Sequence, residues 1–264
     1  MRDRRGAVTR PVHEFGGATR QWGIAVETPV EIGLNGAPWT VMMATPNDLE
    51  DLAVGIALTE RVVARDTIEA VSIQHFLEGI AVDLTVPAES IAPTLQRRRS
   101  LEGRVGCGLC GVEALAGLPQ RPDESTPPRA RIDVRAVRAA FDALAARQPL
   151  NRETHSVHAA AWCRPDGTID LVREDVGRHN ALDKVVGALA RARRLDNDGF
   201  VVMTSRCSFE LVYKAALTRA AALATISAPT SLALDWSIAL GLPILSRGAD
   251  GAIVEFPYEP PHAA

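Results

Sequence analysis

The sequence predicts an α/β protein with two parts, a small α+β unit followed by a unit whose sheet is mostly parallel. Strand-like and helix-like segments alternate through the second half of the chain, which is the pattern of a sheet covered by helices. The halves are separated by GLPQRPDESTPPRAR, residues 117–131, which is rich in proline and charge and has no periodicity. We therefore expect one unit over residues 1–128 and a second over residues 129–264.

The composition is that of a globular protein. The chain has 264 residues, of which 47% are hydrophobic and 23% charged, enough for one large core or two smaller ones. The formal net charge of -3 does not indicate a nucleic-acid binder, so any bound anion needs a local site. Four cysteines are too few for a disulfide scaffold. Two of them, Cys163 and Cys207, stand alone beside apolar residues, and we expect them to be buried thiols.

No segment of the chain predicts a secretory signal or a membrane span. The N-terminus is basic, but no apolar run follows it. Residues 220–245 are long and apolar, but Pro229 and Asp235 interrupt them, and a charge at mid-span is costly. We expect a buried strand, helix and strand here, and a cytoplasmic protein that binds neither membranes nor nucleic acid.

The first predicted elements are a hairpin and a helix. Strands over residues 30–34 and 38–42 flank Asn35-Gly36, a dipeptide that tolerates the positive φ angles of a tight turn. A helix then follows Thr45, which we expect to cap it, with a proline at the first helical position. The apolar residues after this start recur at helical spacing, so one face of the helix packs inward.

A second strand pair is expected over residues 68–74 and 80–86, around Glu78-Gly79. Beyond residue 86 the periodicity is lost, which predicts a loop. Four arginines lie in this loop: Arg97, Arg98, Arg99 and Arg104.

The second unit alternates between predicted helices and strands. Helices are expected over residues 134–147, 178–193, 209–222 and 231–240, and strands over residues 157–163, 168–172, 199–204, 224–227 and 243–246. In such sheets, ligands bind beyond the carboxyl ends of the strands. Polar residues suited to phosphate or hydroxyl groups gather at those ends: Thr204, Ser205, Arg206, Ser208, Ser227, Thr230, Ser231, Ser246, Arg247 and Gly248.

The motif GCGLCG, residues 106–111, places Cys107 and Cys110 among three glycines. Structural zinc needs four ligands, but there is no second cysteine pair, and His155 and His158 would point to opposite faces of a predicted strand. A redox pair at a helix N-terminus is disfavoured because glycine is a poor helix former. Sulfur carriage fits better, since it needs a thiolate on a backbone that can move. The spacing alone leaves all three uses open.

A second motif, EDVGRHNALDKV over residues 174–185, covers the start of a predicted helix. Arg178 and His179 lie at its positive end, where they would form an anion pocket with the free backbone N–H groups. His179 and Asp183 are four residues apart and share a face. An ordinary surface helix start with a polar pair explains this spacing equally well.

Together with other blocks, these motifs resemble the FdhD family of formate dehydrogenase accessory sulfurtransferases. In chain order the blocks are NDLEDLAVGIALTE, GCGLCG, EDVGRHNALDKVVG, SFELVYKAA and ISAPTSLALD. They are spread over most of the chain, and their order is that of the family.

The resemblance implies a cytoplasmic sulfurtransferase, a sulfur carrier that formate dehydrogenase needs for activity. Such a carrier takes sulfur from a cysteine desulfurase as a cysteine persulfide. It passes the sulfur to the molybdenum cofactor, bis-molybdopterin guanine dinucleotide, before the cofactor enters formate dehydrogenase. The resemblance also implies a homodimer and a cytidine-deaminase-like α/β/α second unit, and we expect no tightly bound metal.

By motif, Cys107 is the implied persulfide carrier and Cys110 its partner. Arg178, His179 and Arg206 are candidate cofactor-binding residues. The implied cofactor-binding segment is LSRGAD: Leu245, Ser246, Arg247, Gly248, Ala249 and Asp250.

The chain departs from the family pattern around this segment. His155 and Ser156 stand where two glycines are usual, Ser205 stands where glycine is usual, and Leu245 replaces a phenylalanine. These departures bear on the contacts to the nucleotide more than on the cysteine motif.

Two other functions compete with sulfur transfer as interpretations of the sequence. Zinc-dependent deamination needs a glutamate two residues after its metal ligand, and His158 is followed by two alanines. The remaining alternative is a chaperone that binds the cofactor and formate dehydrogenase without transferring sulfur.

Overall fold

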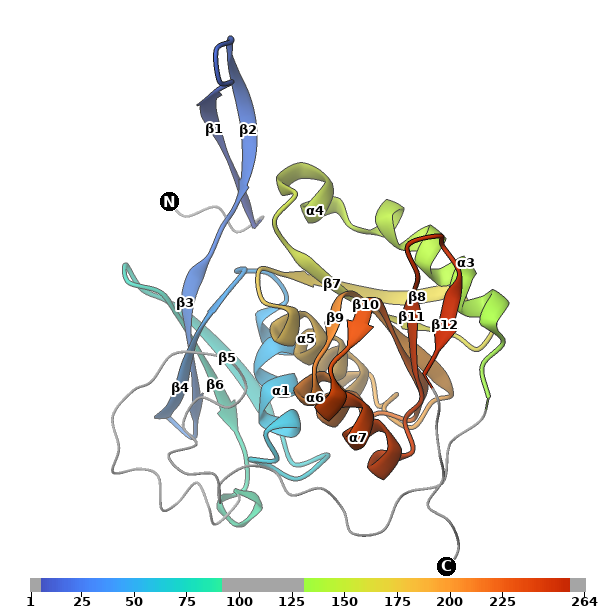
Figure 1. Cartoon of the computed structure of the whole chain (residues 1–264). Helices are drawn as coiled ribbons and strands as arrows, with labels where there is room; N and C mark the ends of the chain where they lie inside the picture. The colour runs from blue at the N-terminus through green and yellow to red at the C-terminus, as the bar shows by residue number, and fades with distance from the viewer. Residues whose placement is uncertain (1–5, 92–130, 257–264) are drawn as a thin grey trace, which may run out of the picture.

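The computed structural model describes residues 6–91 and 131–256 of the chain. Its strands form three sheets, of two, four and six strands (Figure 1). The predicted boundary after residue 128 lies outside the described residues, so the division into two units there stays a prediction. Cys107 and Cys110 lie outside them as well.

The four-stranded sheet belongs to the first half of the chain and has the order β4-β3-β6-β5. Its strands are β3 (Thr28–Leu34), β4 (Ala37–Ala44), β5 (Ala70–His75) and β6 (Ile80–Thr85), and the short 3-10 helix η1 (Ala88–Ser90) follows. Both predicted strand pairs are therefore confirmed. Asn35 and Gly36 form the first turn with φ angles of 52° and 77°. Parallel pairing of β3 with β6 joins the two hairpins.

Helix α1 (Leu49–Thr59) packs against this sheet and confirms the predicted helix, but its start is different. Asp48, with φ of 52°, precedes the helix, and no side chain caps it. Thr45 is fully buried, and its hydroxyl donates to Asp175 Oδ2 at 2.8 Å. A tertiary contact therefore uses the hydroxyl that the sequence predicted as a cap.

The six-stranded sheet has the order β12-β11-β10-β9-β7-β8. Its strands are β7 (His158–Cys163), β8 (Ile169–Asp175), β9 (Gly199–Cys207), β10 (Ala220–Pro229), β11 (Ile244–Arg247) and β12 (Ile253–Glu255). Strands β9, β10 and β11 are parallel, as predicted. Strand β7 is antiparallel to both β8 and β9, and β12 is antiparallel to β11.

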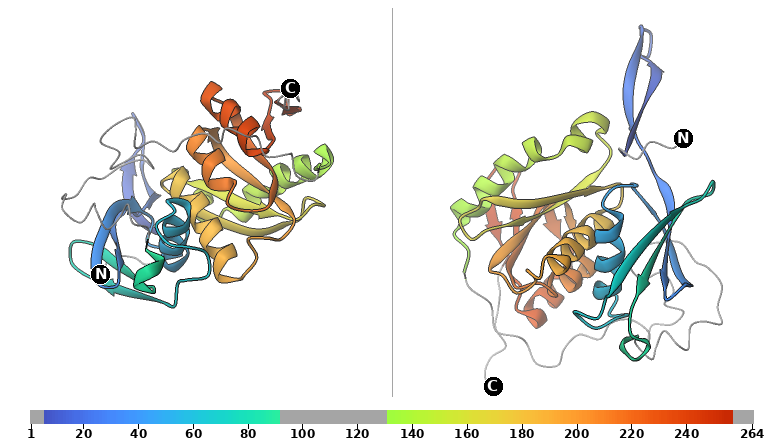
Figure 2. Two further views of the ribbon diagram at one scale, coloured as in Figure 1. Left: turned by 90° about the horizontal axis from the view of Figure 1, so that it is seen from below. Right: turned by 180° about the vertical axis from the view of Figure 1, so that it is seen from behind.

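Helices cover both faces of this sheet (Figure 1; Figure 2). They are α3 (Val134–Leu144), continued by η3 (Ala145–Arg147), α5 (Arg178–Arg191), α6 (Phe209–Ala215) and α7 (Ser231–Leu240). Alternate strand residues divide between two cores: Phe200 and Val202 pack with α3, and Val201 and Met203 with the other three helices. This α/β/α arrangement confirms the predicted fold class.

The predicted helix over residues 209–222 is too long. Helix α6 ends at Ala215, and Ala220 already begins β10. The run from Ala220 to Ala224 is almost fully buried on both faces, so it lacks the alternation that marks a half-exposed strand, and its alanines favour a helix. Residues 220–245 form a strand, a helix and a strand, as predicted. In the described ranges, no helix combines the length and the apolar character needed to cross a bilayer.

The sequence did not predict the first hairpin, made of β1 (Ala7–His13) and β2 (Thr19–Ala25), nor helix α4 (Pro149–Thr154) and β12. The hairpin extends away from the rest of the molecule (Figure 1; Figure 2). Midway along it, the ring centroid of Trp22 lies 5.9 Å from that of His155. His155 ends α4 with φ of 54°, so it does not share a strand with His158, and the predicted strand geometry of this pair is wrong.

Helices α1 and α5 pack unusually closely. A methyl group on Gly55 would lie 1.8 Å from the carbonyl oxygen of Asp183, and one on Gly187 would lie 1.9 Å from that of Asp51. Glycine at both positions lets the backbones approach. The largest core is continuous across this contact, from the four-stranded sheet through α1 and α5 to the six-stranded sheet.

Candidate functional site

Four strands of the larger sheet end at the same edge. Strands β9, β10 and β11 are parallel, and β8 runs with them because both β8 and β9 are antiparallel to β7. His158, at the start of β7, is paired in register with Asp175 at the end of β8 and so lies at this edge as well. The edge carries the start of α5 and the residues predicted to bind a phosphate-containing ligand.

Helix α5 begins at this edge without a side-chain cap. Its first two residues carry atoms that are buried and have no hydrogen-bond partner among the described residues, namely Arg178 Nε and His179 Nε2. His179 Nε2 does lie 2.9 Å from Glu210 Oε2, which is an ion-pair distance without the alignment of a hydrogen bond. Contact with His179 holds the pKa of Glu210 below its usual value, against the effect of burial. Free N–H groups and a cationic side chain at a helix start favour an anion.

His158 belongs to the same cluster. Burial is the main reason that its pKa is lowered, and the charges of Arg178 and His179 lower it further, while Asp175 acts in the opposite direction. The neighbouring backbone N–H of Ala159 donates to Thr204 Oγ1 at 2.9 Å, which ties the start of β7 to the end of β9. The cluster thus combines cationic groups with an imidazole that stays neutral near pH 7.

The end of β9 supplies Arg206, which is exposed, and Ser205, which is buried with its hydroxyl bonded to its neighbour's carbonyl oxygen at 3.0 Å. Arg206 is in register with Ser227 of β10. Arg206 can therefore reach a ligand above the strand ends, whereas the Ser205 hydroxyl is already used in a hydrogen bond to the backbone.

The segment over residues 245–250 likewise contains both buried residues and residues that a ligand can reach. Leu245 is buried in the core under α3, and Ser246 is buried with its hydroxyl 3.2 Å from Thr225 Oγ1. Arg247 is exposed and pairs with Asp142 of α3 at 3.0 Å. Only the last four residues of the segment, from Arg247 onward, are placed to meet a ligand.

The turn after β11 is closed by short hydrogen bonds. The Gly248 N–H donates to the Ala252 carbonyl at 2.7 Å, and Asp250 Oδ1 accepts from the Ala252 N–H at 2.9 Å. A methyl group on Gly248 would lie 2.8 Å from Asp250 Oδ1, so glycine fits this tight turn better than other residues. Asp250 therefore shapes the turn, and Ala249 is exposed on it.

The predicted residues form a row along the sheet edge. The ends of β8 and β11 are separated by β7, β9 and β10, so these two strand ends lie four strand spacings apart, roughly 19 Å. Arg206 and Ser227 lie between them. Sequence reasoning had no means to add Glu210, because its contact with His179 depends on the start of α6 lying beside the start of α5.

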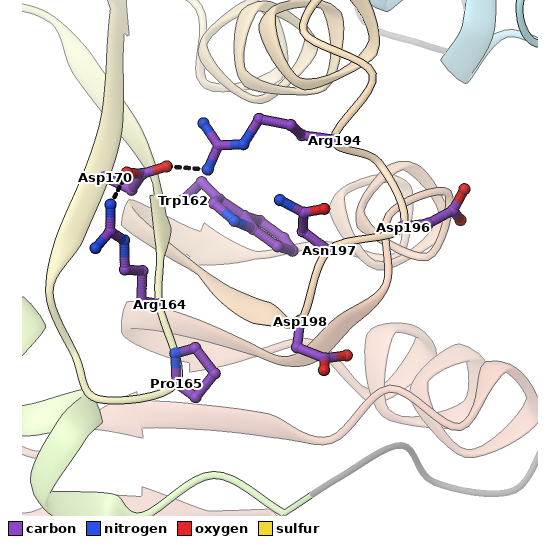
Figure 3. Close-up of a pocket in the computed structure, with 8 residues that line it drawn as sticks. All are labelled: Trp162, Arg164, Pro165, Asp170, Arg194, Asp196, Asn197 and Asp198. Carbon is purple, nitrogen blue, oxygen red and sulfur yellow. Dashed lines mark hydrogen bonds and ion pairs between the residues drawn. The ribbon is translucent and has the colours of Figure 1, made fainter.

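A hollow lined by described residues lies elsewhere (Figure 3). It has a volume of about 700 Å³ and lies near the start of β9, at the opposite edge of the sheet. Arg164 and Arg194 both pair with Asp170 beside Trp162, and Asp196 and Asp198 also line the hollow, so its lining has no excess of positive charge. We therefore place the candidate anion site at the row of strand ends.

Two of the four cysteines lie within the described residues. Cys163 and Cys207 are buried and free, as predicted. Burial raises the pKa of both thiols to about 12, with a contribution from Asp170 at Cys163. Neither is a nucleophile at neutral pH, so any reactive thiolate must come from Cys107 or Cys110.

The fold and this row define an α/β/α protein with a cationic edge suited to an elongated anionic ligand. Comparison with known proteins is more specific: the model of the FdhD/NarQ family matches residues 25–253. A relative from Xanthomonas axonopodis pv. citri, the sulfur carrier protein FdhD, is 47% identical over 97% of this chain and 92% of its own length. The protein of the same name from Variovorax paradoxus is 45% identical over 90% of this chain and 86% of its own length. The chain therefore belongs to the FdhD/NarQ family.

A solved crystal structure from Desulfotalea psychrophila, assigned as a formate dehydrogenase accessory protein, has the same fold. The two chains superpose with a TM-score of 0.69 over 97% of each, at 21% sequence identity. The likeness confirms the fold.

Proposed function

We propose that this protein is a sulfur carrier that acts before formate dehydrogenase becomes active. In the proposed reaction, the thiolate of Cys107 attacks the terminal sulfur of a cysteine desulfurase persulfide. The new S–S bond leaves a persulfide on Cys107, and the desulfurase cysteine departs as a thiolate. Family membership and the GCGLCG motif carry this proposal. The inert, buried Cys163 and Cys207 support the assignment of the reactive sulfur to the motif.

The acceptor is proposed to be bis-molybdopterin guanine dinucleotide, whose phosphates and guanine would lie along the row of strand ends. Cationic groups and free N–H groups are offered by Arg178, His179, Arg206 and the turn at Arg247, along a row of strand ends that spans roughly 19 Å from β8 to β11. An elongated dinucleotide suits a row better than a compact pocket. Action in the cytoplasm as a homodimer belongs to the same proposal, with the cysteine desulfurase and formate dehydrogenase as its partners.

Intact mass spectrometry tests the sulfur transfer directly. The purified protein is incubated with a cysteine desulfurase and cysteine, and peptide mapping locates any added sulfur. We expect one added sulfur on Cys107 in the wild type and none there in Cys107→Ala. Formate dehydrogenase activity supported by Cys107→Ala at the wild-type level would favour a chaperone that binds the cofactor without transferring sulfur.

Guanosine diphosphate is a simple probe for the nucleotide half of the acceptor. We expect Arg206→Ala and Arg247→Ala each to weaken its binding by about tenfold, the loss of one charge-assisted contact to a phosphate. Arg219→Ala is a matched control, because this exposed arginine precedes β10 at the opposite edge of the sheet. Equal affinities for all three variants and the wild type would show that the nucleotide does not bind at the row of strand ends.

A further inference from the structure

A buried group of three polar residues connects the segment before α1 to the end of β8. Lys184 and Asp175 are both fully buried, with Lys184 Nζ 2.7 Å from Asp175 Oδ2. Thr45 completes the group: its hydroxyl donates to Asp175 Oδ2 at 2.8 Å and accepts from Lys184 Nζ at 2.8 Å. The three side chains satisfy one another in a place that water does not reach.

A second group of the same composition lies at the other end of α1. Lys214 Nζ is 2.9 Å from Asp183 Oδ2, and the Thr59 hydroxyl donates to Asp183 Oδ1 at 2.7 Å and accepts from Lys214 at 3.0 Å. All three residues are buried. Helix α1 is therefore fastened to the second half of the chain at both ends by a lysine, an aspartate and a threonine.

Only the first group is hydrogen-bonded to the turn before α5, which belongs to the candidate site. Asp175 Oδ1 accepts from the Gly177 N–H at 2.8 Å and from Asn180 Nδ2 at 2.9 Å, and Asn180 also donates to the Met43 carbonyl at 2.9 Å. With the Thr45 N–H at 3.0 Å, Asp175 therefore accepts four hydrogen bonds from three residues and forms an ion pair with Lys184. These bonds enclose the turn that sets the direction of Arg178 and His179. In the second group, Lys214 instead extends to Glu60, at 3.0 Å.

We propose that Asp175 is a positioning residue for anion binding, fixing the start of α5 so that Arg178 and His179 point along the row of strand ends. This inference rests on the proposed function. The four hydrogen bonds and the ion pair with Lys184 are disturbed if the turn moves, so the carboxylate allows one arrangement of Gly177 and the first turn of α5. The same contacts through Thr45 and Met43 fix that turn relative to the segment before α1.

Paired substitutions in the two groups separate positioning from stability. Asp175→Asn places an amide group, itself a donor, where all neighbours are donors, and Asp183→Asn makes the same change in the other group. Both variants lose stability because each removes a buried carboxylate from a buried lysine, although Lys214 keeps its contact with Glu60. At a temperature where both are folded, we expect Asp175→Asn to raise the Kd for guanosine diphosphate about tenfold and Asp183→Asn to change it less than about twofold.

A second pair of variants, with smaller changes, tests the proposal if Asp175→Asn does not fold. Thr45→Val and Thr59→Val keep the side-chain shape and remove one hydroxyl from each group. We expect only Thr45→Val to weaken nucleotide binding, and Thr45→Ser to restore it. Equal affinities for the matched variants would overturn the positioning role.

Hydrogen exchange gives a measurement that does not depend on any ligand. Amides of residues 176–181 should exchange faster in Thr45→Val than in Thr59→Val, because only the first change loosens the turn before α5. Equal exchange in this segment refutes the inference, whether or not nucleotide binds. Faster exchange in Thr45→Val, together with no nucleotide binding by the wild type, retains the positioning role and refutes the proposed nucleotide site.

Discussion

The close contact of α1 with α5 predicts that alanine is not tolerated at either glycine of the interface. On helix propensity alone, Gly55→Ala or Gly187→Ala in mid-helix would stabilise the protein by about 1 kcal/mol. The structure predicts the opposite result. The added methyl groups would lie 1.8 Å and 1.9 Å from carbonyl oxygens of the facing helix.

The size of the effect follows from the distance that the helices must move. Real Cβ atoms essentially never approach another atom more closely than 3.0 Å, so the first clash requires the helices to separate by about 1.2 Å, the difference between 3.0 and 1.8. A gap of that order forfeits about half of each dispersion contact across the interface. Over the apolar residues that α1 and α5 share, this outweighs the gain in helix propensity. We expect a net loss of at least about 2 kcal/mol for each variant.

Urea denaturation followed by circular dichroism measures this loss. Once one substitution has separated the helices, the second clashes less, so Gly55→Ala and Gly187→Ala together should cost less than the sum of the single losses. Serine at position 187 should cost more than alanine because its side chain is larger. A single alanine variant as stable as the wild type would show that the helices do not meet at the distance seen here.

Three further predictions concern single side chains. The stability of the wild type should fall as the pH drops below about 6.5, because His158 takes up a proton there in the unfolded chain, whereas its lowered pKa resists protonation in the folded protein. His158→Gln should remove this loss. Equal slopes of stability against pH for the two proteins, in urea melts from pH 5 to 8, would contradict this. Iodoacetamide should leave Cys163 and Cys207 unlabelled in the native protein and modify both in urea, since burial raises each thiol pKa to about 12; native labelling of either, seen by peptide mass spectrometry, would count against the packing. Asn35→Ala should destabilise the protein by about 2 kcal/mol in urea melts, because it loses two hydrogen bonds to the Val86 backbone, both of 2.9 Å, at a residue with positive φ; a change below about 0.5 kcal/mol would contradict this estimate.

Local patterns in the sequence predicted the elements that have a clear period or a marked turn. The Asn35-Gly36 hairpin and helices α5 and α7 appear where expected, because their apolar spacing or turn residues determine them locally. Strand β10 was partly mistaken for helix, since a strand buried on both faces has no alternation to detect. The hairpin of β1 and β2 is mostly exposed, so it carries little apolar pattern at all.

The candidate site was predictable by residue type and less so by arrangement. Arg178, His179 and Arg206 lie at strand ends and a helix start as expected, because their positions follow from sheet order. Leu245 and Ser246 point to opposite faces of β11 and are both buried, because helices cover both faces of the sheet, which the motif alone could not indicate. The contacts of Asp175 could not be predicted from the sequence either, since two of its four hydrogen bonds come from Thr45, which is far away in the chain.

The fastening of α1 also bears on how a persulfide in the first half of the chain could meet a ligand in the second. The described chain reaches Ile91, which bridges to Val63 just after α1, so the point of departure towards Cys107 is fixed to the body that holds Arg178. From Ile91 to Cys107 a fully extended chain spans at most about 55 Å. This length is the upper limit of the distance from Ile91 at which Cys107 could deliver sulfur within one protomer.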